Sequence, residues 1–430
     1  MPAHRYAQTL VFAIALGAAT AAFSAEPAEQ MGQWGQLFRP ASVPSIAGKD
    51  WIEFETGPYD YDLKHRGWRM DDDAEQLQIL TWEGELQRFR KPKPGVTRPE
   101  VEKVERDPNG RIVSMKIRHD QDPGFMTAWE IEECDFTEMC EYQLKGWPPA
   151  IDVGFMNRAD QFAYDKKDAM RNLVDSAKYA AYAFDHGEIE IANQLHKLAR
   201  DQHKAYLEKY REAEQDLDQF LVEHQARELR TSAIRRGRAG ISRGELLALW
   251  QQILSLPKNK LQPEADQMAT SYQRLIEEDI DWEEPRADEI ASMPVDQQVA
   301  YWMHQLRDHN ARQQTEPGMC NVLLVPTVPE GETAPPNPAD ELRKLGTAAI
   351  PALIEHMDDT RPTRCFGYWR IASDDDIHLL TYGDCCVQIF EAIANKRIYR
   401  RKTTTSYPST DGQAADCQAK AAAWWQEQQP

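Results

Sequence analysis

Two segments near the C-terminus share one spacing of apolar side chains, and this repeat restricts the possible folds more than any other feature. Gly346 and Gly383, 37 residues apart, each precede a run in which apolar residues recur at every third or fourth position. That spacing places the side chains on one face of a helix. One helix cannot bury such a face alone, so we expect stacked helical layers. The matching positions are Ile350 and Val387, Leu353 and Phe390, and Met357 and Ala394.

The first of these segments resembles a HEAT-type helical repeat. The resemblance rests on Leu345-Gly346, on the run Ala349-Ile350-Pro351-Ala352-Leu353-Ile354, and on Asp358-Asp359 after the expected helix. Pro351 agrees with it, since repeats of this family often carry a proline in the inner helix. The resemblance covers about residues 338–400 and implies an α-solenoid module with a binding surface, without implying a reaction. The longer, aromatic segment between the copies, 360–381, is expected to form a decorated loop.

The N-terminus has the pattern of a secretory signal peptide. Arg5 precedes an apolar run from Leu10 to Phe23, and Ala22-Phe23-Ser24-Ala25 supplies small residues for an Ala-x-Ala-like cleavage site. The apolar run is too short to cross a bilayer, and no later run approaches about 20 apolar residues. The sequence therefore predicts cleavage after Ala25 and a secreted or periplasmic bacterial protein without a membrane span.

The formal net charge of −20 limits the partners that this chain is expected to bind. Nucleic acids and anionic lipid surfaces both attract proteins with a basic surface. We therefore expect no nucleic-acid partner and no docking on anionic lipid. The 41% of hydrophobic residues and the 12 tryptophans are sufficient for buried cores.

The sequence predicts a mainly α protein with an N-terminal antiparallel β portion, an α+β class. Alternating apolar and polar residues at 76–82 and 85–89 predict a β-hairpin around Gly84. Further strands are expected at 101–105, 112–117, 128–131 and 140–144. The expected parts are a signal peptide (1–25), a flexible N-terminus (26–48), a small β domain (49–150), a helical domain of α-α hairpins (155–312), a proline-rich linker (315–338), and the HEAT-like helical module with a C-terminal cap helix (339–430).

Seven cysteines in an exported chain predict disulfide bonds. The odd number leaves at least one thiol without a partner inside the chain. Cys134 and Cys140 flank a short polar turn and are expected to staple a hairpin. The paired Cys-x-x-Cys spacing of a zinc site is missing, so we expect no metal and no cofactor. The disulfide candidates are Cys134, Cys140, Cys365, Cys385, Cys386 and Cys417.

No sequence motif predicts catalysis. The chain has no His-Glu-x-x-His, no Gly-x-Ser-x-Gly and no glycine-rich phosphate loop. Several polar groups each allow two interpretations, a ligand or acid–base site and an ordinary solvated turn or helix side. They are Asp71–Asp73, Asp374–Asp376 with His378, His119 with Asp120 and Asp122, and the helix-spaced pair His196 and His203.

The segment between the two repeat copies carries the candidate binding residues. Arginines interleaved with aromatic residues are frequent at binding hot spots. The other interpretation is that the aromatic residues close the end of the helical stack and the arginines pair with Asp358 and Asp359. A second, weaker hypothesis is an anion site at Arg235, Arg236 and Arg238, which equally fit a helix C-terminus with acidic neighbours. The candidate binding residues are Arg361, Arg364, Phe366, Tyr368, Trp369 and Arg370.

These observations favour a non-enzymatic extracytoplasmic interaction or scaffold protein that binds a protein or polymer partner through a helical repeat surface. A hydrolase or lyase acting on an extracellular polymer is the alternative from another class. In that alternative, carboxylates at 71–73 or 119–122 serve as acid and base between the β and helical domains. A structural component of the envelope is a third possibility.

Overall fold

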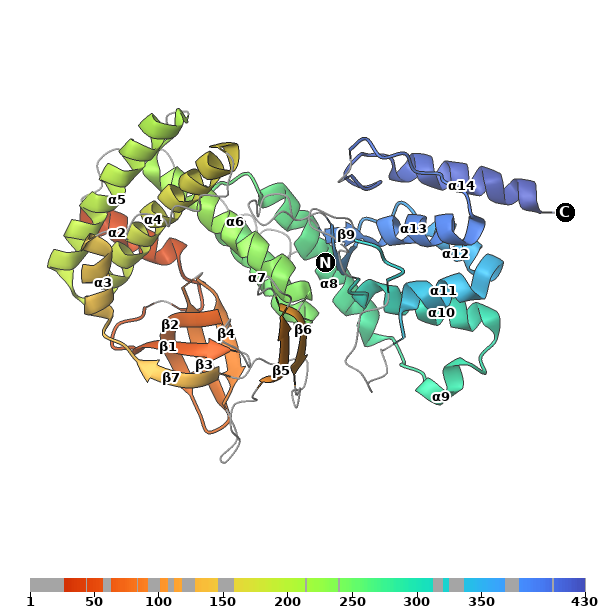
Figure 1. Ribbon diagram of the computed structural model, residues 1–430, viewed down its shortest axis with the longest axis horizontal. Coiled ribbons are helices and arrows are strands. Elements are labelled where there is room, and N and C mark those ends of the chain that lie inside the picture. The colour runs from red at the N-terminus through yellow and green to blue at the C-terminus, as the bar shows by residue number, and fades with distance from the viewer. Residues whose placement is uncertain are drawn as a thin grey trace, which may run out of the picture. The chain divides into compact units, whose positions relative to one another are not determined.

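The structure is a computed structural model of the chain (Figure 1). It describes residues 27–43, 45–56, 63–82, 84–91, 101–106, 112–117, 128–145, 158–212, 215–238, 240–311, 320–324, 336–367, 379–403 and 406–429. The predicted signal peptide lies outside these residues, as does most of the predicted proline-rich linker.

The chain divides into two compact units, each discontinuous in sequence. The first unit comprises Met1–Lys49, Asp135–Val153 and Asp165–Leu217. The second comprises Asp50–Cys134, Gly154–Tyr164 and Asp218–Pro430.

Helix α2 (Pro27–Leu37) of the first unit corrects one prediction, because the sequence predicts a flexible segment over 26–48. Met31 and Trp34 of α2 are buried. The Trp34 ring stacks on the His196 imidazole at 5.0 Å, and His196 Nε2 lies 2.7 Å from the Gln30 amide oxygen. The helix was not predicted because its few apolar residues stand among polar ones in the sequence, although they share one helical face.

Helix α3 (Phe136–Lys145) corrects the predicted strand at 140–144 and the hairpin expected between Cys134 and Cys140. The Asp135 carboxylate accepts a hydrogen bond from the Thr137 N–H at 2.8 Å, which starts the helix. Phe136, Cys140 and Gln143 are buried on one helical face. The apolar residues of this segment therefore follow a helical period, and a period of two was the wrong assignment.

Two long helices supply most of the remaining part of the first unit, in the range where the sequence predicts α-α hairpins. They are α4 (Arg158–His186) and α5 (Ile189–Tyr210). Gly187 joins them with φ +94°, a left-handed conformation that glycine adopts without strain. Leu173 and Ala177 of α4 are fully buried, as is Leu195 of α5.

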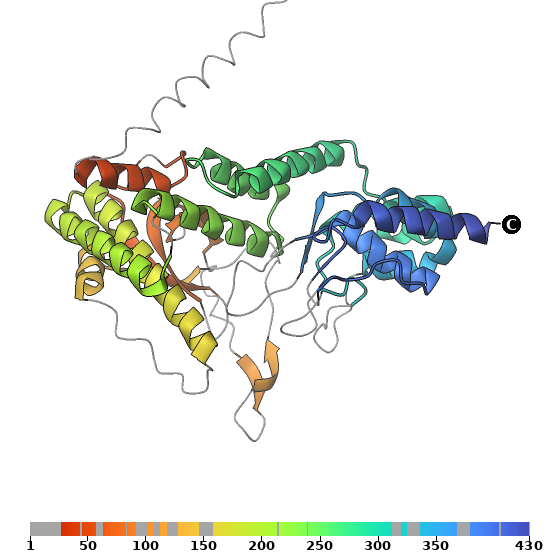
Figure 2. The ribbon, with the colours of Figure 1, turned by 90° about the horizontal axis from the view of Figure 1, so that it is seen from above.

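A five-stranded antiparallel sheet with strand order β4-β3-β2-β1-β7 begins the second unit. Its core consists of Ile52, Phe54, Leu77, Ile79 and Phe89. The predicted hairpin is confirmed as β3 and β4. A separate hairpin, β5–β6, stands apart from this sheet (Figure 2). The strands are β1 (Trp51–Thr56), β2 (Leu63–Asp72), β3 (Gln76–Thr81), β4 (Leu86–Arg90), β5 (Val101–Arg106), β6 (Ile112–Ile117) and β7 (Ala128–Glu133).

Three helices follow the sheet in the second unit. Ser242 begins α7 with a capping box, in which Glu245 N–H donates to the Ser242 hydroxyl at 3.2 Å. The Ser242 N–H in turn donates to the Glu245 carboxylate at 3.1 Å, which completes the capping box. Trp250 and Ile253 of α7 are fully buried. The helices are α6 (Leu217–Arg238), α7 (Arg243–Ser255) and α8 (Gln262–Ile280).

The C-terminal part of the second unit consists of short helices packed in layers (Figure 1). Ile350, Leu353, Met357, Val387 and Phe390 are all buried in one core, as the repeated spacing predicts. Strands β8 (Pro362–Phe366) and β9 (Leu379–Thr381) pair with each other, which corrects the loop predicted over 360–381. The helices are α9 (Ala287–Ile290), α10 (Val295–Gln305), η1 (Leu306–Asp308), α11 (Pro338–Leu345), η2 (Gly346–Ala349), α12 (Ile350–Glu355), α13 (Tyr382–Ala394) and α14 (Ala414–Gln428).

Gly383 permits a close approach between the start of α13 and the chain that follows α12. A Cβ atom at this position would lie 2.3 Å from the Met357 carbonyl oxygen and 3.1 Å from the Asp359 carbonyl oxygen. The Gly383 N–H donates to the same Asp359 oxygen at 3.0 Å. Any side chain here would therefore force the start of α13 away from the end of α12.

The protein is mainly α with an N-terminal antiparallel β portion, as the sequence predicts. Among the described residues, no helix combines the length and the apolar character that crossing a bilayer requires.

Candidate functional site

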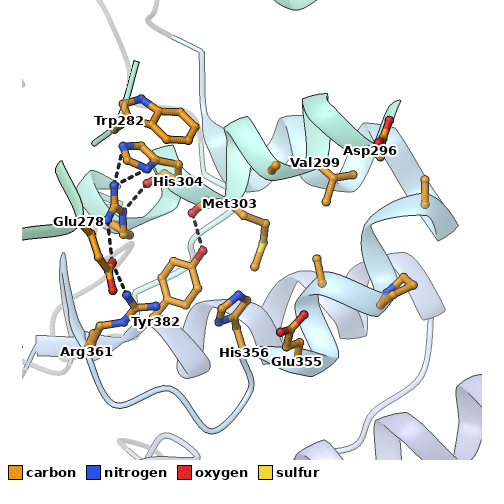
Figure 3. Close-up of a pocket in the computed structure, with 15 residues that line it drawn as sticks. Glu278, Trp282, Asp296, Val299, Met303, His304, Glu355, His356, Arg361 and Tyr382 are labelled. Carbon is orange, nitrogen blue, oxygen red and sulfur yellow. Dashed lines mark hydrogen bonds and ion pairs between the residues drawn. The ribbon is translucent and has the colours of Figure 1, made fainter. Parts of the chain in front are cut away.

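A groove runs between two helical faces of the second unit, with a volume of about 560 Å³ (Figure 3). Its lining residues recur every third or fourth position on each side, which is how one face of a helix is exposed. The α10 side, continued by η1, contributes Asp296, Val299, Ala300, Met303, His304 and Arg307. The opposite side, η2 with α12 and its end, contributes Ala348, Pro351, Ala352, Glu355 and His356.

The floor of the groove is apolar and made of small or flexible side chains. Val299 and Met303 are buried beneath it, whereas Ala300, Ala348 and Pro351 are exposed along it. Such a floor lets the backbone or apolar side chains of another molecule approach both helices. Small side chains here leave space that bulky ones would fill.

One end of the groove is closed by an aromatic stack. The Trp282 and His304 rings are nearly parallel, with centroids 3.4 Å apart. Burial, followed by the positive charges of Arg307 and Arg243, lowers the pKa of His304 to about 4. The imidazole is therefore neutral at pH 7 and accepts a hydrogen bond from the Arg307 guanidinium.

The two arginines that line the groove are already paired with carboxylates. Glu278 accepts hydrogen bonds from Arg307 at 3.1 Å and from Arg361 at 2.6 Å. Arg361 also forms a bidentate pair with Asp359. Burial opposes ionisation of Asp359, but hydrogen bonds from His356 and Arg361 outweigh it and hold the pKa of Asp359 well below its usual range. These cations therefore offer little net positive charge to a ligand.

Two further arginines, Arg243 and Arg364, extend this network of ion pairs. Arg243 pairs with Asp279 and Asp308, and Arg364 donates to Asp308 at 2.7 Å. The Arg243 side chain is only 9% exposed, so its charge is balanced inside the fold. The network ties α7 and α8 to η1 and β8.

Two carboxylates at the groove remain available. Asp296 on α10 and Glu355 on α12 are both exposed and stand on the two sides of the groove (Figure 3). Neither forms an ion pair with any residue in the described part of the chain. The groove therefore combines an apolar floor with negative charge on both rims.

The predicted binding residues between the repeat copies are distributed differently from the expectation. Arg361 lines the groove but is paired with Asp359, as the second interpretation anticipated. Arg364 donates to the carbonyl oxygens of Gly237 at 2.8 Å and Ile241 at 2.9 Å, besides Asp308. Phe366 ends β8 and is half-buried. Tyr368, Trp369 and Arg370 lie outside the described residues.

The predicted anion-binding arginines on α6 do not all face solvent. Arg236 pairs with the buried Glu85 at 3.1 Å and with Glu245 at 3.6 Å. Arg235 is exposed, and the side chain of Arg238 lies outside the described part. Arg236 thus anchors α6 to the sheet.

The structure corrects the prediction of disulfide bonds, because no disulfide joins any of the seven cysteines. Cys140 lies in α3 rather than on a strand opposite Cys134. Cys365, Cys385, Cys386 and Cys417 are buried in the core of the C-terminal helices. Their side chains pack as small apolar groups there.

The polar groups with two interpretations are mostly structural where they are described. Asp72 pairs with Lys91, and Asp73 accepts the N–H groups of Glu75 and Gln76 at 2.7 Å each, which forms a turn. His196 and His203 are buried in the first unit. His119 with Asp120 and Asp122, and Asp374–Asp376 with His378, lie outside the described residues. The described part contains no cluster of side chains suited to a metal ion.

Sequence analysis missed the groove residues of α10 and α12. Val299, Trp302 and Leu306 form a stripe of apolar residues with helical spacing, and all three are buried. The groove residues of α10 start at Asp296 and recur at the same helical spacing, so this second face of the helix could have been detected in the sequence. No protein-family model, no curated protein and no solved structure matches this chain.

Proposed function

We propose that this protein is a non-enzymatic extracytoplasmic interaction protein that binds a short segment of a partner protein in the groove. The segment carries apolar side chains for the floor and lysine or arginine for the rims. The observation that carries the proposal is the pair of exposed carboxylates, Asp296 and Glu355, above an apolar floor with paired cations. Charge complementarity of this kind selects partners and speeds association.

The architecture supports a binding role in a second way. The helices from 338 to 394 pack in layers around one core, and we propose that they form a HEAT-like module. Stacks of helical repeats bind partners along extended concave surfaces. Export is part of the same proposal, and it rests on the signal-peptide pattern at residues 1–25.

The test uses synthetic peptides of defined chemistry and the mature chain, residues 26–430. A peptide library that combines leucine, isoleucine or methionine with lysine or arginine is screened by fluorescence anisotropy. Matched peptides replace the basic residues by glutamate or the apolar ones by serine. We expect binding by the basic, apolar peptides and at least about tenfold weaker binding by both matched sets.

A pair of double variants identifies the site. Asp296→Asn with Glu355→Gln removes the rim charges and is expected to weaken binding by about tenfold. Asp288→Asn with Glu277→Gln removes two exposed carboxylates that do not line the groove and is expected to leave affinity unchanged. Equal weakening by the two variants, or no peptide that binds, would reject the proposal.

A further inference from the structure

A second candidate site lies at a run of basic residues that does not line the groove. Five of the seven residues from Lys396 to Lys402 are lysine or arginine, in a chain whose net charge is −20. The run begins directly after Asn395, which ends α13 with φ 47°. It forms no helix or strand and leads toward α14.

This run lines a cavity of about 690 Å³, which we call the arginine cavity. Arg397, Arg400 and Arg401 contribute three exposed guanidinium groups from the loop, and Lys420 faces the same cavity from α14. Four cations therefore line one space, which favours the approach of an anion.

The nearby carboxylates hold the loop backbone. Glu391 of α13 accepts hydrogen bonds from the N–H groups of Ile398 at 2.8 Å and Tyr399 at 2.9 Å. Asp411 accepts from the Tyr399 hydroxyl at 2.8 Å and from the Lys402 N–H at 3.0 Å. These bonds fix the course of the loop and so fix where its guanidinium groups emerge.

The guanidinium charges themselves are not balanced. Arg397, Arg400 and Arg401 form no ion pair with a carboxylate in the part of the chain that the structure describes. Lys420 differs, because it pairs with Asp416 at 2.6 Å. The charged residues that line the cavity are therefore four cations and one carboxylate, Glu391, so cations are in excess there although the protein as a whole is acidic.

We propose that the arginine cavity binds a small multivalent oxyanion, a molecule with two or more phosphate or carboxylate groups. Guanidinium forks bind such groups through two parallel hydrogen bonds, which ammonium groups cannot reproduce. Three guanidinium groups around one space can bind several anionic groups of the same ligand. A ligand with several such groups should therefore bind more tightly than a ligand with one. Tyr399 and Ile398 add an apolar margin for the body of the ligand.

The arginine cavity shares no residue with the groove, so the two proposals fail independently. The groove is formed mainly by α10 and α12, with Tyr382 from the start of α13, whereas the cavity is formed by later residues of α13, by α14 and by the loop between them. A chain that binds peptides and no oxyanion, or the reverse, would separate them.

The experiment is calorimetric titration of the mature chain with pyrophosphate and with citrate at fixed ionic strength. Orthophosphate, which has a single phosphate group, is titrated for comparison. We expect pyrophosphate or citrate to bind at least about tenfold more tightly than orthophosphate. Tighter binding of pyrophosphate assigns a phosphorylated ligand, and tighter binding of citrate assigns a carboxylated one. Absence of binding by both overturns the proposal.

Three variants locate and explain the binding. The triple variant Arg397→Gln, Arg400→Gln, Arg401→Gln is expected to lose at least about tenfold in affinity. The control variant Lys260→Gln, Arg274→Gln, Arg286→Gln removes the same charge from exposed positions outside the cavity and is expected to keep the affinity. The variant Arg397→Lys, Arg400→Lys, Arg401→Lys keeps the charge and is expected to lose part of the affinity. An equal loss in the control variant, or full affinity in the glutamine variant, overturns the proposal.

Discussion

The groove and the arginine cavity contain the same kinds of charged residue, yet they offer opposite charges to a ligand. In the groove, carboxylates pair with Arg307 and Arg361, and two other carboxylates are left on the rims. In the cavity, carboxylates accept backbone N–H groups, and the guanidinium groups are left. The comparison teaches that the pairing of charges, and not their number, decides what each surface attracts.

The largest expected effect comes from Gly383→Ala, which tests whether both sites depend on one helix. The new Cβ atom would overlap the Met357 carbonyl oxygen, so α13 must shift. We expect a loss of about 3 kcal/mol in the free energy of unfolding, measured by urea denaturation. Because α13 carries Tyr382 of the groove and Glu391 of the cavity, peptide and oxyanion binding should weaken together.

Gly244→Ala is the matched control for this substitution. Gly244 lies in α7, and its added Cβ atom would meet nothing closer than 4.0 Å. Alanine favours the helix, so stability should stay the same or rise by about 0.5 kcal/mol. Equal stability changes in the two variants would show that the close approach at Gly383 does not constrain the fold.

An intermediate effect on stability is expected when the pH is lowered. It arises from His304 of the groove and not from the arginines of the cavity. The pKa of His304 is about 4 in the fold and 6.5 in the unfolded chain. Between these pH values the unfolded state binds more protons than the folded state. The contribution of His304 to stability therefore falls as the pH falls, and it is fully present above pH 6.5. The arginines of the cavity keep their charge throughout this range.

We expect His304 to account for about 2 kcal/mol of the stability lost between about pH 7 and pH 5. The measurement is urea denaturation at both pH values for the natural chain and for His304→Phe, which keeps a ring against Trp282. The difference between the two chains isolates His304 from His203, whose pKa burial also lowers. An unchanged pH dependence in His304→Phe would contradict the assigned role.

The smallest effect is expected from Tyr382→Phe, which alters the groove alone. The Tyr382 hydroxyl donates to the Met303 carbonyl oxygen, and both groups are buried. Removing the hydroxyl should cost about 1 kcal/mol in the free energy of unfolding. Oxyanion affinity, measured by the same calorimetric titration, should stay constant, since Tyr382 does not line the cavity. A parallel loss of oxyanion affinity would indicate that the two sites are coupled.

Much of the fold was predictable, because the spacing of apolar residues and the capping residues of helices are local signals. The hairpin around Gly84, the capping box at Ser242 and the buried faces at Leu353 and Phe390 all follow from short stretches of sequence. Helix α3 was not predicted, because the five residues from 140 to 144 fit the spacing of a strand as well as that of a helix. Only the cap at Asp135 distinguishes the helix from the strand.

The sites were harder to predict, because a sequence does not state which charges pair. Arg361 and Arg364 have the pattern of a binding hot spot, but their partners Glu278 and Asp308 lie far away in the chain. The basic run 396–402 was visible as a charge count and was overlooked in favour of the arginines near 235. Its availability depends on Glu391 bonding to backbone, which only the structure displays.

Three of the four cations of the arginine cavity, Arg397, Arg400 and Arg401, stand on a loop whose side chains are mostly exposed. Of the run from Lys396 to Lys402, only Ile398 is buried. Substitutions among the exposed positions would alter the preferred ligand while the helical core keeps its packing. Related chains can thus diverge in what they capture at little risk to folding, which makes this loop the place where natural variation in specificity should concentrate.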